Sequence, residues 1–389
     1  MSNPPRSGLH NFIRDLVTVD FSPLTRADIY TGLRLSILVL AVLVLGLITH
    51  HVSESALAML GTAYVLAVEL IRTAVLKDTT HTTRVMLSVS LLYASIYAIG
   101  VVISTSEYFA TLFLAIGLFI VSYSYVYPKA RLYCYLASLV FVASLGLTGS
   151  SSVTLTMAVP SFLLIFAGGL WAIVGSKIFP LRIAKGKEGS VTERTVQEQD
   201  NKTKVSWRDR IEPLIENLSI HSQNLQYALV VATTTAIGML ISRWFEVDEG
   251  IWIVITINVV LNRNYSDVSA SLTVWKVVHR FVGTVIGAVI ALIIIDNIHD
   301  IWWLSFLLSI FVIVYLIFIR IKNYAFTVIF MTTFILLLID IINQGASSMA
   351  PIERILNIFI GGILCLIASL IWRYFSHKRS SPLLRDKTL

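Results

Sequence analysis

Charged side chains are scarce in this chain. Lys, Arg, Asp and Glu make up 14% of its 389 residues, whereas 56% of the residues are hydrophobic. A soluble domain carries about 25% charged residues, so this composition excludes a large soluble domain. The hydrophobic residues form runs of about 20, the length at which a helix crosses the ~30 Å apolar core of a bilayer. The sequence therefore predicts an all-α polytopic membrane protein and not an enzyme.

Several chemical motifs are also missing. The two cysteines, Cys134 and Cys365, lie inside apolar runs, and neither cysteines nor histidines have metal-ligand spacing. The chain has no Gly-rich phosphate loop of the Walker type and no Ser/His/Asp constellation in a supporting context. We therefore expect no disulfide, metal, cofactor or ATP-driven step. The net charge of +7 does not indicate nucleic acid, because the basic residues lie between apolar runs, where they set membrane topology.

Twelve apolar segments are interpreted as membrane spans. They lie at 29–49, 55–76, 85–103, 107–127, 132–149, 153–176, 225–242, 250–262, 278–296, 301–320, 323–342 and 354–375. This pattern predicts five regions along the chain. They are a cytoplasmic N-terminal segment with an amphipathic helix (1–28), a first six-helix transmembrane repeat (29–176), a cytoplasmic linker with an amphipathic interfacial helix (177–224), a second six-helix repeat (225–375) and a cytoplasmic basic tail (376–389).

The basic residues indicate how these segments are oriented. With the N-terminus in the cytoplasm, all of the 30 Lys and Arg residues except Arg243 and Arg354 fall on the cytoplasmic side, and acidic residues such as Glu54, Glu107 and Glu246 fall outside. Cytoplasmic loops are rich in Lys and Arg, and one missed span would destroy this separation for half of the chain. We therefore expect a multi-pass protein of the cytoplasmic (inner) membrane with both termini in the cytoplasm.

The two sets of six segments are related by position. Adding 195 to the first set places it near the second, so that Ile29 falls on Asn224 and Arg84 falls one residue short of Arg280. Because each set has an even number of spans, both would enter the membrane from the same side. This predicts two parallel repeats related by an axis along the membrane normal, as in some transporters. Evenly spaced helical hairpins without a repeat are the alternative.

Polar residues inside the apolar segments mark a candidate pathway, because unpaired polar groups are costly in a bilayer. Within the segment 250–262 the apolar stretch 251–261 is about half the length needed to span, and it carries Thr256 and Asn258, which we expect to line a pathway. Its repeat partner carries Glu69, the candidate for proton coupling. The alternative for Glu69 is a local ion pair with Arg72, roughly one turn away.

Three arginines lie at the ends of predicted spans. Arg84 and Arg280 begin spans on the cytoplasmic side, and Arg354 begins the last span on the outer side. A pore with Arg at both mouths would favour anions. The alternative is that these side chains only anchor the helix ends at the interface. Small residues, which let neighbouring helices approach closely, follow two of these arginines at Gly283, Gly287, Gly361 and Gly362.

A longer pattern in the second half resembles a known family. It comprises Trp-Ile-Val-Ile-Thr at 252–256, Arg-Phe-Val-Gly-Thr-Val-Ile-Gly at 280–287, and Arg354 ahead of Gly361. These residues resemble the fusaric acid resistance protein-like family, which includes aromatic acid exporters and is related to the plant aluminium-activated malate transporters. The Arg-x-x-Gly-Thr-x-x-Gly element is the most specific feature, and Lys-Asn-Tyr at 322–324 is also similar to the family.

The resemblance implies six plus six spans, cytoplasmic termini and movement of organic anions, often aromatic carboxylates, outward. In the first half the pattern is degenerate, because Arg84 is present but residues 86–97 contain no Gly-Thr pair. The motif positions carried over to this chain are Arg280, Gly283, Thr284 and Gly287, supported by Trp252, Thr256 and Arg354.

The sequence thus predicts a secondary, proton-driven exporter of small organic anions such as aromatic carboxylic acids. The arginines would hold the carboxylate, Trp252 would stack on an aromatic ring, and Thr256 and Asn258 would hydrogen-bond the solute. A passive organic-anion channel and a non-transport envelope scaffold are the alternatives. The expected partners are the small organic anion and the lipid bilayer, with a homo-oligomer and a membrane-fusion partner left open and no nucleic acid.

Overall fold

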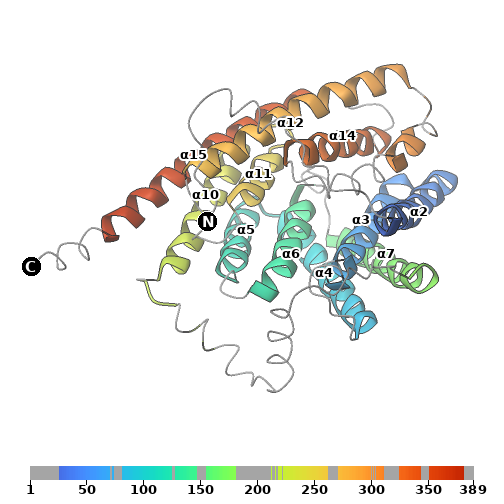
Figure 1. Ribbon diagram of the computed structural model, residues 1–389, viewed down its shortest axis with the longest axis horizontal. Helices are drawn as coiled ribbons and strands as arrows, with labels where there is room; N and C mark the ends of the chain where they lie inside the picture. The colour runs from blue at the N-terminus through green and yellow to red at the C-terminus, as the bar shows by residue number, and fades with distance from the viewer. Residues whose placement is uncertain are drawn as a thin grey trace, which may run out of the picture.

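All regular structure in the described part of the molecule is helical (Figure 1). The computed structural model describes residues 26–70, 72–73, 81–124, 128–146, 155–180, 222–261, 270–298, 304–310, 324–342 and 350–380, with residues 212, 215, 218–220, 300 and 302 between them. The predicted N-terminal amphipathic helix, most of the linker with its amphipathic helix, and residues 381–389 of the basic tail lie outside these ranges.

Each predicted apolar segment contains a described helix. The first half holds α2 (Arg26–Thr49), α3 (Val52–Leu70), α4 (Thr82–Ser104), α5 (Glu107–Tyr123), α6 (Pro128–Gly146) and α7 (Ala158–Ile178), the last preceded by the 3₁₀ turn η3 (Leu155–Met157). The second half holds α10 (Gln223–Trp244), α11 (Ile251–Leu261), α12 (Ala270–Asn297), helical residues 304–310, α14 (Tyr324–Ile342) and α15 (Ala350–Ser380).

Eight of the described helices are long and apolar enough to cross a membrane. Three further apolar helices are shorter, and α11 is the shortest with 11 residues. At a rise of about 1.5 Å per residue, α11 is roughly 16 Å long, about half of the hydrocarbon core. The structure therefore confirms an all-helical polytopic membrane protein in which α11 cannot span alone.

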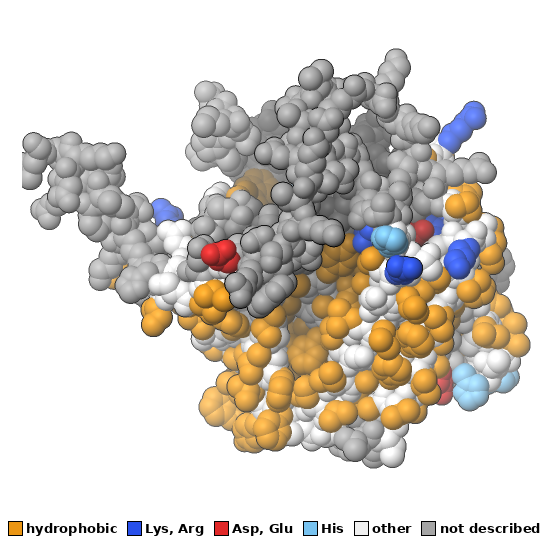
Figure 2. All heavy atoms as spheres, turned by 90° about the horizontal axis from the view of Figure 1, so that it is seen from below, with side chains coloured by type: hydrophobic (Ala, Val, Ile, Leu, Met, Phe, Trp, Pro, Cys, Tyr) orange, Lys and Arg blue, Asp and Glu red, His pale blue; other side chains and the backbone are white. Residues whose placement is uncertain are grey.

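The outer surface is apolar, as a lipid-facing surface must be. Figure 2 shows hydrophobic side chains covering most of the described surface on the face it presents, with few charged side chains among them. On α15 the exposed residues recur at helical spacing, at Ile352, Leu356, Phe359, Ile363, Ile367 and Leu370. Buried polar residues lie on the opposite side of the same helix, at Arg354 and Asn357. Apolar side chains therefore face outward and polar ones face the neighbouring helices.

Glycines allow the closest helix crossings within each half. In the second half Gly361 of α15 lies against α11, where an added Cβ would be 2.9 Å from the carbonyl oxygen of Ile253. In the first half Gly168 of α7 lies in the same way against the carbonyl of Ala58 on α3. Of the other predicted packing glycines, Gly283 and Gly287 lie against α14 and Gly362 lies against Val277 of α12.

The two halves also contact each other in a reciprocal way. The fourth helix of the first half, α5, packs along α10, the first helix of the second half, through Leu114, Leu118 and Met239. Conversely, α2 packs against the helical residues 304–310 and α14 through Leu43, Leu47, Leu304, Leu308, Leu337 and Ile341. In Figure 1 α5 and α6 lie beside α10 and α11, between the second half and the group formed by α2, α3, α4 and α7.

The Gly361 crossing yields a first prediction. Replacing Gly361 with alanine should lower the stability of the purified protein by about 1–3 kcal/mol, because the methyl group overpacks against backbone that cannot rotate away. The matched control is Gly117→Ala in α5, where an added Cβ meets only ring carbons of Phe141 at 3.5 Å and alanine favours the helix. Thermal unfolding in detergent micelles measures both variants. Equal melting temperatures for the two would contradict the close crossing.

Candidate functional site

Arg354 is buried in the second half, and no carboxylate of the described residues forms an ion pair with it. It lies in the first turns of α15, is 3% exposed, and places its guanidinium carbon 3.6 Å from the ring centroid of Trp252 on α11. Its Nε and Nη1 atoms are buried and have no hydrogen-bond partner among the described residues. A cation over an indole face is stabilised by about 0.5–2 kcal/mol. This contact involves the face of the guanidinium, so it does not satisfy the N–H donors at its edge.

Arg280 reaches the next turn of the same short helix. It lies inside α12, is 8% exposed, and donates from Nε to the Thr256 hydroxyl oxygen at 3.2 Å. Its Nη1 lies 3.5 Å from the hydroxyl of Tyr324, the first residue of α14. The Thr256 hydroxyl in turn donates to the carbonyl of Trp252 at 2.8 Å. Four helices, α11, α12, α14 and α15, therefore converge on this site.

The two arginines lie closer together than the sequence predicts. Arg280 and Arg354 were expected at opposite mouths of a pore, yet they contact Thr256 and Trp252, which are one turn apart on α11 and separated by a rise of about 6 Å. Neither forms an ion pair with a carboxylate in the part of the chain that the structure describes. Like charges this close repel in a buried site, so a bound anion would stabilise the pair.

Two more polar groups lie one turn beyond the arginines. Thr284 follows Arg280 by four residues on α12, and its hydroxyl oxygen is buried without a described partner. Asn357 follows Arg354 by three residues on α15, donates to the carbonyl of Asp248 at 2.8 Å, and keeps its Oδ1 buried without a described partner. Buried polar atoms are normally hydrogen-bonded, so these groups extend the unsatisfied polar surface around the arginines.

Two predicted pathway residues have different surroundings from those expected. Asn258 is fully buried and donates to the hydroxyl of Ser138 on α6 at 3.0 Å, so it lies at the contact between the halves and away from Arg280. Trp252 has Arg354 over one face of its ring, so that face is not open for stacking on a solute. Its role here is to support the guanidinium.

In the first half, Glu69 is part of a closed polar cluster. Its Oε2 lies 2.6 Å from Nη2 of Arg34 on α2 and accepts a hydrogen bond from the Ser176 hydroxyl on α7 at 2.9 Å. Arg34 also lies 2.8 Å from the Ser176 oxygen. Glu69 thus forms an ion pair with Arg34, a partner that the sequence did not predict. Arg84 is exposed at the beginning of α4, where the structure brings it to none of the site residues of the second half.

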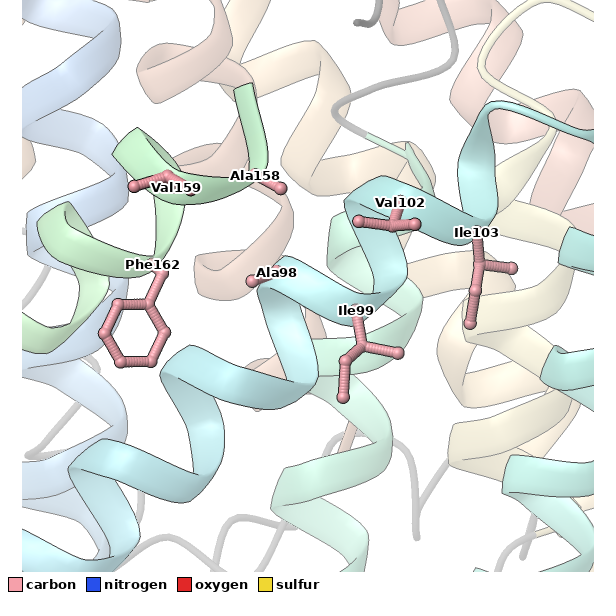
Figure 3. Close-up of a pocket in the computed structure, with 7 residues that line it drawn as sticks. All are labelled: Ala98, Ile99, Val102, Ile103, Ala158, Val159 and Phe162. Atoms are coloured by element: carbon pink, nitrogen blue, oxygen red, sulfur yellow. The ribbon is translucent and has the colours of Figure 1, made fainter. Parts of the chain in front are cut away.

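One pocket among the described residues is apolar and lies apart from the arginines. Figure 3 shows its lining at the end of α4 and the beginning of α7, where only hydrophobic side chains project into it. They are Ala98, Ile99, Val102, Ile103, Ala158, Val159 and Phe162. Several of them are exposed on the lipid-facing surface. This hollow has no donor for an anion, and the candidate site is therefore the arginine pair.

Sequence reasoning missed three residues that belong to the site, namely Tyr324, Asn357 and Glu249. Tyr324 is next to the site because it begins α14 and faces α12, and it was noted only as part of a motif. Asn357 is recognisable in retrospect, because it is polar and three residues from Arg354 on the same helix face. Glu249 accepts a hydrogen bond from Trp252 Nε1 at 3.0 Å from a loop position, and spacing alone gave no signal for that contact.

Comparisons with known proteins cover the region of the chain that contains these residues. Residues 235–368 match the model of the fusaric acid resistance protein-like family, and this range includes Trp252, Thr256, Arg280 and Arg354. An uncharacterized protein of Synechocystis is 28% identical over 155 residues, which is 40% of this chain and 20% of that protein. The chain thus spans about a fifth of the length of this relative.

No solved structure matches the chain significantly. The family match covers the helices that carry both buried arginines and the glycines beside them. It therefore supports the resemblance noted in the sequence, and residues 235–368 of the chain are similar to the fusaric acid resistance protein-like family.

Proposed function

We propose that this protein is a secondary transporter of small organic anions such as aromatic carboxylic acids, and that their movement is coupled to a proton gradient. The observation that carries the proposal is the buried pair Arg280 and Arg354, which lies on four helices of a membrane protein without a described carboxylate partner. Inserting one arginine at the centre of a membrane helix costs about 2.5–3.5 kcal/mol on insertion scales. A site that retains two such side chains is suited to a solute that neutralises them.

The geometry favours a carboxylate over a bulky or cationic solute. A guanidinium presents planar, forked donors that match the two oxygens of a carboxylate. Arg354 offers free donors at its edge, while its flat face rests on Trp252. Tyr324 supplies an aromatic side chain beside the charges, which supports an organic anion, and the family resemblance supports an aromatic one.

The arrangement of the helices supports a two-repeat mechanism. The second and sixth helices of each half cross at a glycine, and the fourth helix of each half packs on the first helix of the other. We infer that twelve spans form two parallel repeats and that the pathway changes access when the halves move against each other. The charge distribution supports an inner-membrane protein with both termini in the cytoplasm, acting by transport and not by catalysis.

Flux into reconstituted vesicles tests the proposal. Vesicles that contain the purified protein should take up or release benzoate in a saturable way, faster than empty vesicles and faster with an imposed pH gradient. Phenylacetamide, which has a similar ring but no charge, is the control solute. If benzoate moves no faster than in empty vesicles under any gradient, the transport proposal fails.

Planar-bilayer recording separates a carrier from a channel. A carrier gives slow, saturable, substrate-dependent flux without resolvable single openings, whereas a channel gives discrete, large anion currents. Discrete currents would replace the exporter with a passive organic-anion channel built on the same two arginines. A scaffold would show neither behaviour.

A further inference from the structure

The turn between α10 and α11 places a carboxylate beside the anion site. Glu249 lies in this turn with φ 50°, in the left-handed region that non-glycine residues seldom adopt. Its Oε2 accepts a hydrogen bond from Trp252 Nε1 at 3.0 Å, and the same indole supports the Arg354 guanidinium. Carboxylate, indole and guanidinium therefore form one connected group.

The turn is held in place from several sides. The side-chain amide of Asn357, on the helix that carries Arg354, donates to the carbonyl of Asp248 at 2.8 Å. The backbone N–H of Trp252 donates to the carbonyl of Glu249 at 3.0 Å. The unfavourable backbone conformation of Glu249 is thus maintained by surrounding contacts, as is common where strain serves a function.

The turn also lies where water can reach it. Trp244 and Phe245, just before the turn, are 86% and 75% exposed, and aromatic residues of this kind collect at the membrane–water interface. Glu246 and Asp248 are exposed in the same turn. A proton from the outer solution can therefore reach Glu249, whereas Glu69 is enclosed by Arg34 and Ser176.

We propose that Glu249 links anion binding at Arg354 to protonation, so that the anion is held more tightly when Glu249 carries a proton. The ionised carboxylate offsets part of the positive charge that an anion would use, and its protonation removes this competition. By linkage, a bound anion favours the protonated carboxyl by the same factor. This inference rests on the proposed anion site and assigns to it a positioning and proton-linked residue outside the membrane helices.

Burial and the charges around Glu249 shift the pKa of its carboxyl. Burial raises the pKa of the Glu249 carboxyl above its usual value, and the neighbouring carboxylates of Glu353 on α15 and Asp248 in the turn raise it further. Arg354 and the hydrogen bond from Trp252 lower the pKa but do not reverse the direction. The carboxylate is therefore protonated at a higher pH than that of an ordinary glutamate.

Equilibrium binding of benzoate to the purified protein in detergent, measured by calorimetry, tests this inference. The wild-type affinity should rise about tenfold between about pH 8 and pH 5, a range in which a carboxylic acid of pKa near 4 stays mostly ionised. Glu249→Gln should bind benzoate at pH 8 as tightly as the wild type does at pH 5, and its affinity should not depend on pH. Glutamine still accepts the hydrogen bond from Trp252, so the support of Arg354 is retained.

Glu246→Gln is the matched control. Glu246 is exposed in the same turn and has a similar left-handed backbone, with φ 47°, and its variant should keep the wild-type pH profile. A pH-dependent affinity that persists in Glu249→Gln overturns the role of Glu249 while leaving the anion site intact. Loss of binding in Arg354→Ala, together with binding in Glu249→Gln that is retained and independent of pH, supports both, and absence of benzoate binding in the wild type at every pH overturns both.

Discussion

Arg354→Ala is expected to lower the kcat/KM for benzoate transport at least about 30-fold, and Arg280→Ala is expected to have a similar effect. Truncating one member of a buried charge contact costs about 2–5 kcal/mol, and about 2 kcal/mol corresponds to this factor. The described contacts of the Arg354 side chain include no hydrogen bond from Nε or Nη1, so alanine should remove the anion contact without breaking a network that holds the fold. Vesicle flux measures the change.

Two further variants make the result specific. Arg354→Lys keeps a positive charge but loses the forked donors and the flat face against Trp252, so its activity should lie between the wild type and alanine. Arg26→Ala removes an exposed arginine at the beginning of α2 and should leave flux unchanged. Full activity in both Arg280→Ala and Arg354→Ala would remove the anion site as an explanation.

Glu69→Gln is expected to destabilise the protein strongly, by about 3 kcal/mol or more. The change leaves the Arg34 guanidinium buried without its counter-charge, and breaking a buried ion pair from one side costs about 3–5 kcal/mol. The double variant Arg34→Gln with Glu69→Gln leaves neither charge of this ion pair buried, so it should recover most of the stability that the single variant loses. Melting temperatures of the three variants in detergent form a double-mutant cycle that measures the coupling.

The same variants test the predicted role of Glu69 in proton coupling. If Glu69 couples protons, the double variant folds but transports benzoate without a response to a pH gradient. If the cluster of Arg34, Glu69 and Ser176 only joins α2, α3 and α7, the double variant keeps its pH response. A single variant that is as stable as the wild type would show that the ion pair does not stabilise the fold.

The helices could be predicted from sequence because lipid imposes a simple length rule. Apolar runs such as 29–49 and 354–375 lie inside α2 and α15, since a run of about 20 apolar residues can bury its backbone only as a helix. The ends were less predictable, because α12 begins at Ala270, before the apolar stretch at 278. Polar residues such as Lys276 can continue a helix beyond the lipid, because water solvates their side chains there.

The residues of the candidate site could be predicted from the sequence better than their arrangement in space. Arg280, Thr256, Trp252 and Arg354 were identified because arginine and threonine are unusual inside apolar segments. Their convergence depends on how α12 and α15 cross α11. The crossing of α15 and α11 depends on the close approach of Gly361 to α11, which residue spacing does not predict. The same reason explains why the sequence, which offered proton coupling or a local pair with Arg72 for Glu69, did not predict the contact of Glu69 with Arg34, 35 residues away.

The reciprocal packing of the halves has a consequence for how the molecule can be divided. Since α5 covers α10, while residues 304–310 and α14 cover α2, each half completes the other. Neither would be an autonomous folding unit, and excising one would uncover a face that is normally hidden. Because the halves contact each other through these helices, we expect two fragments that are translated separately and divided within residues 181–211 to recombine in the membrane.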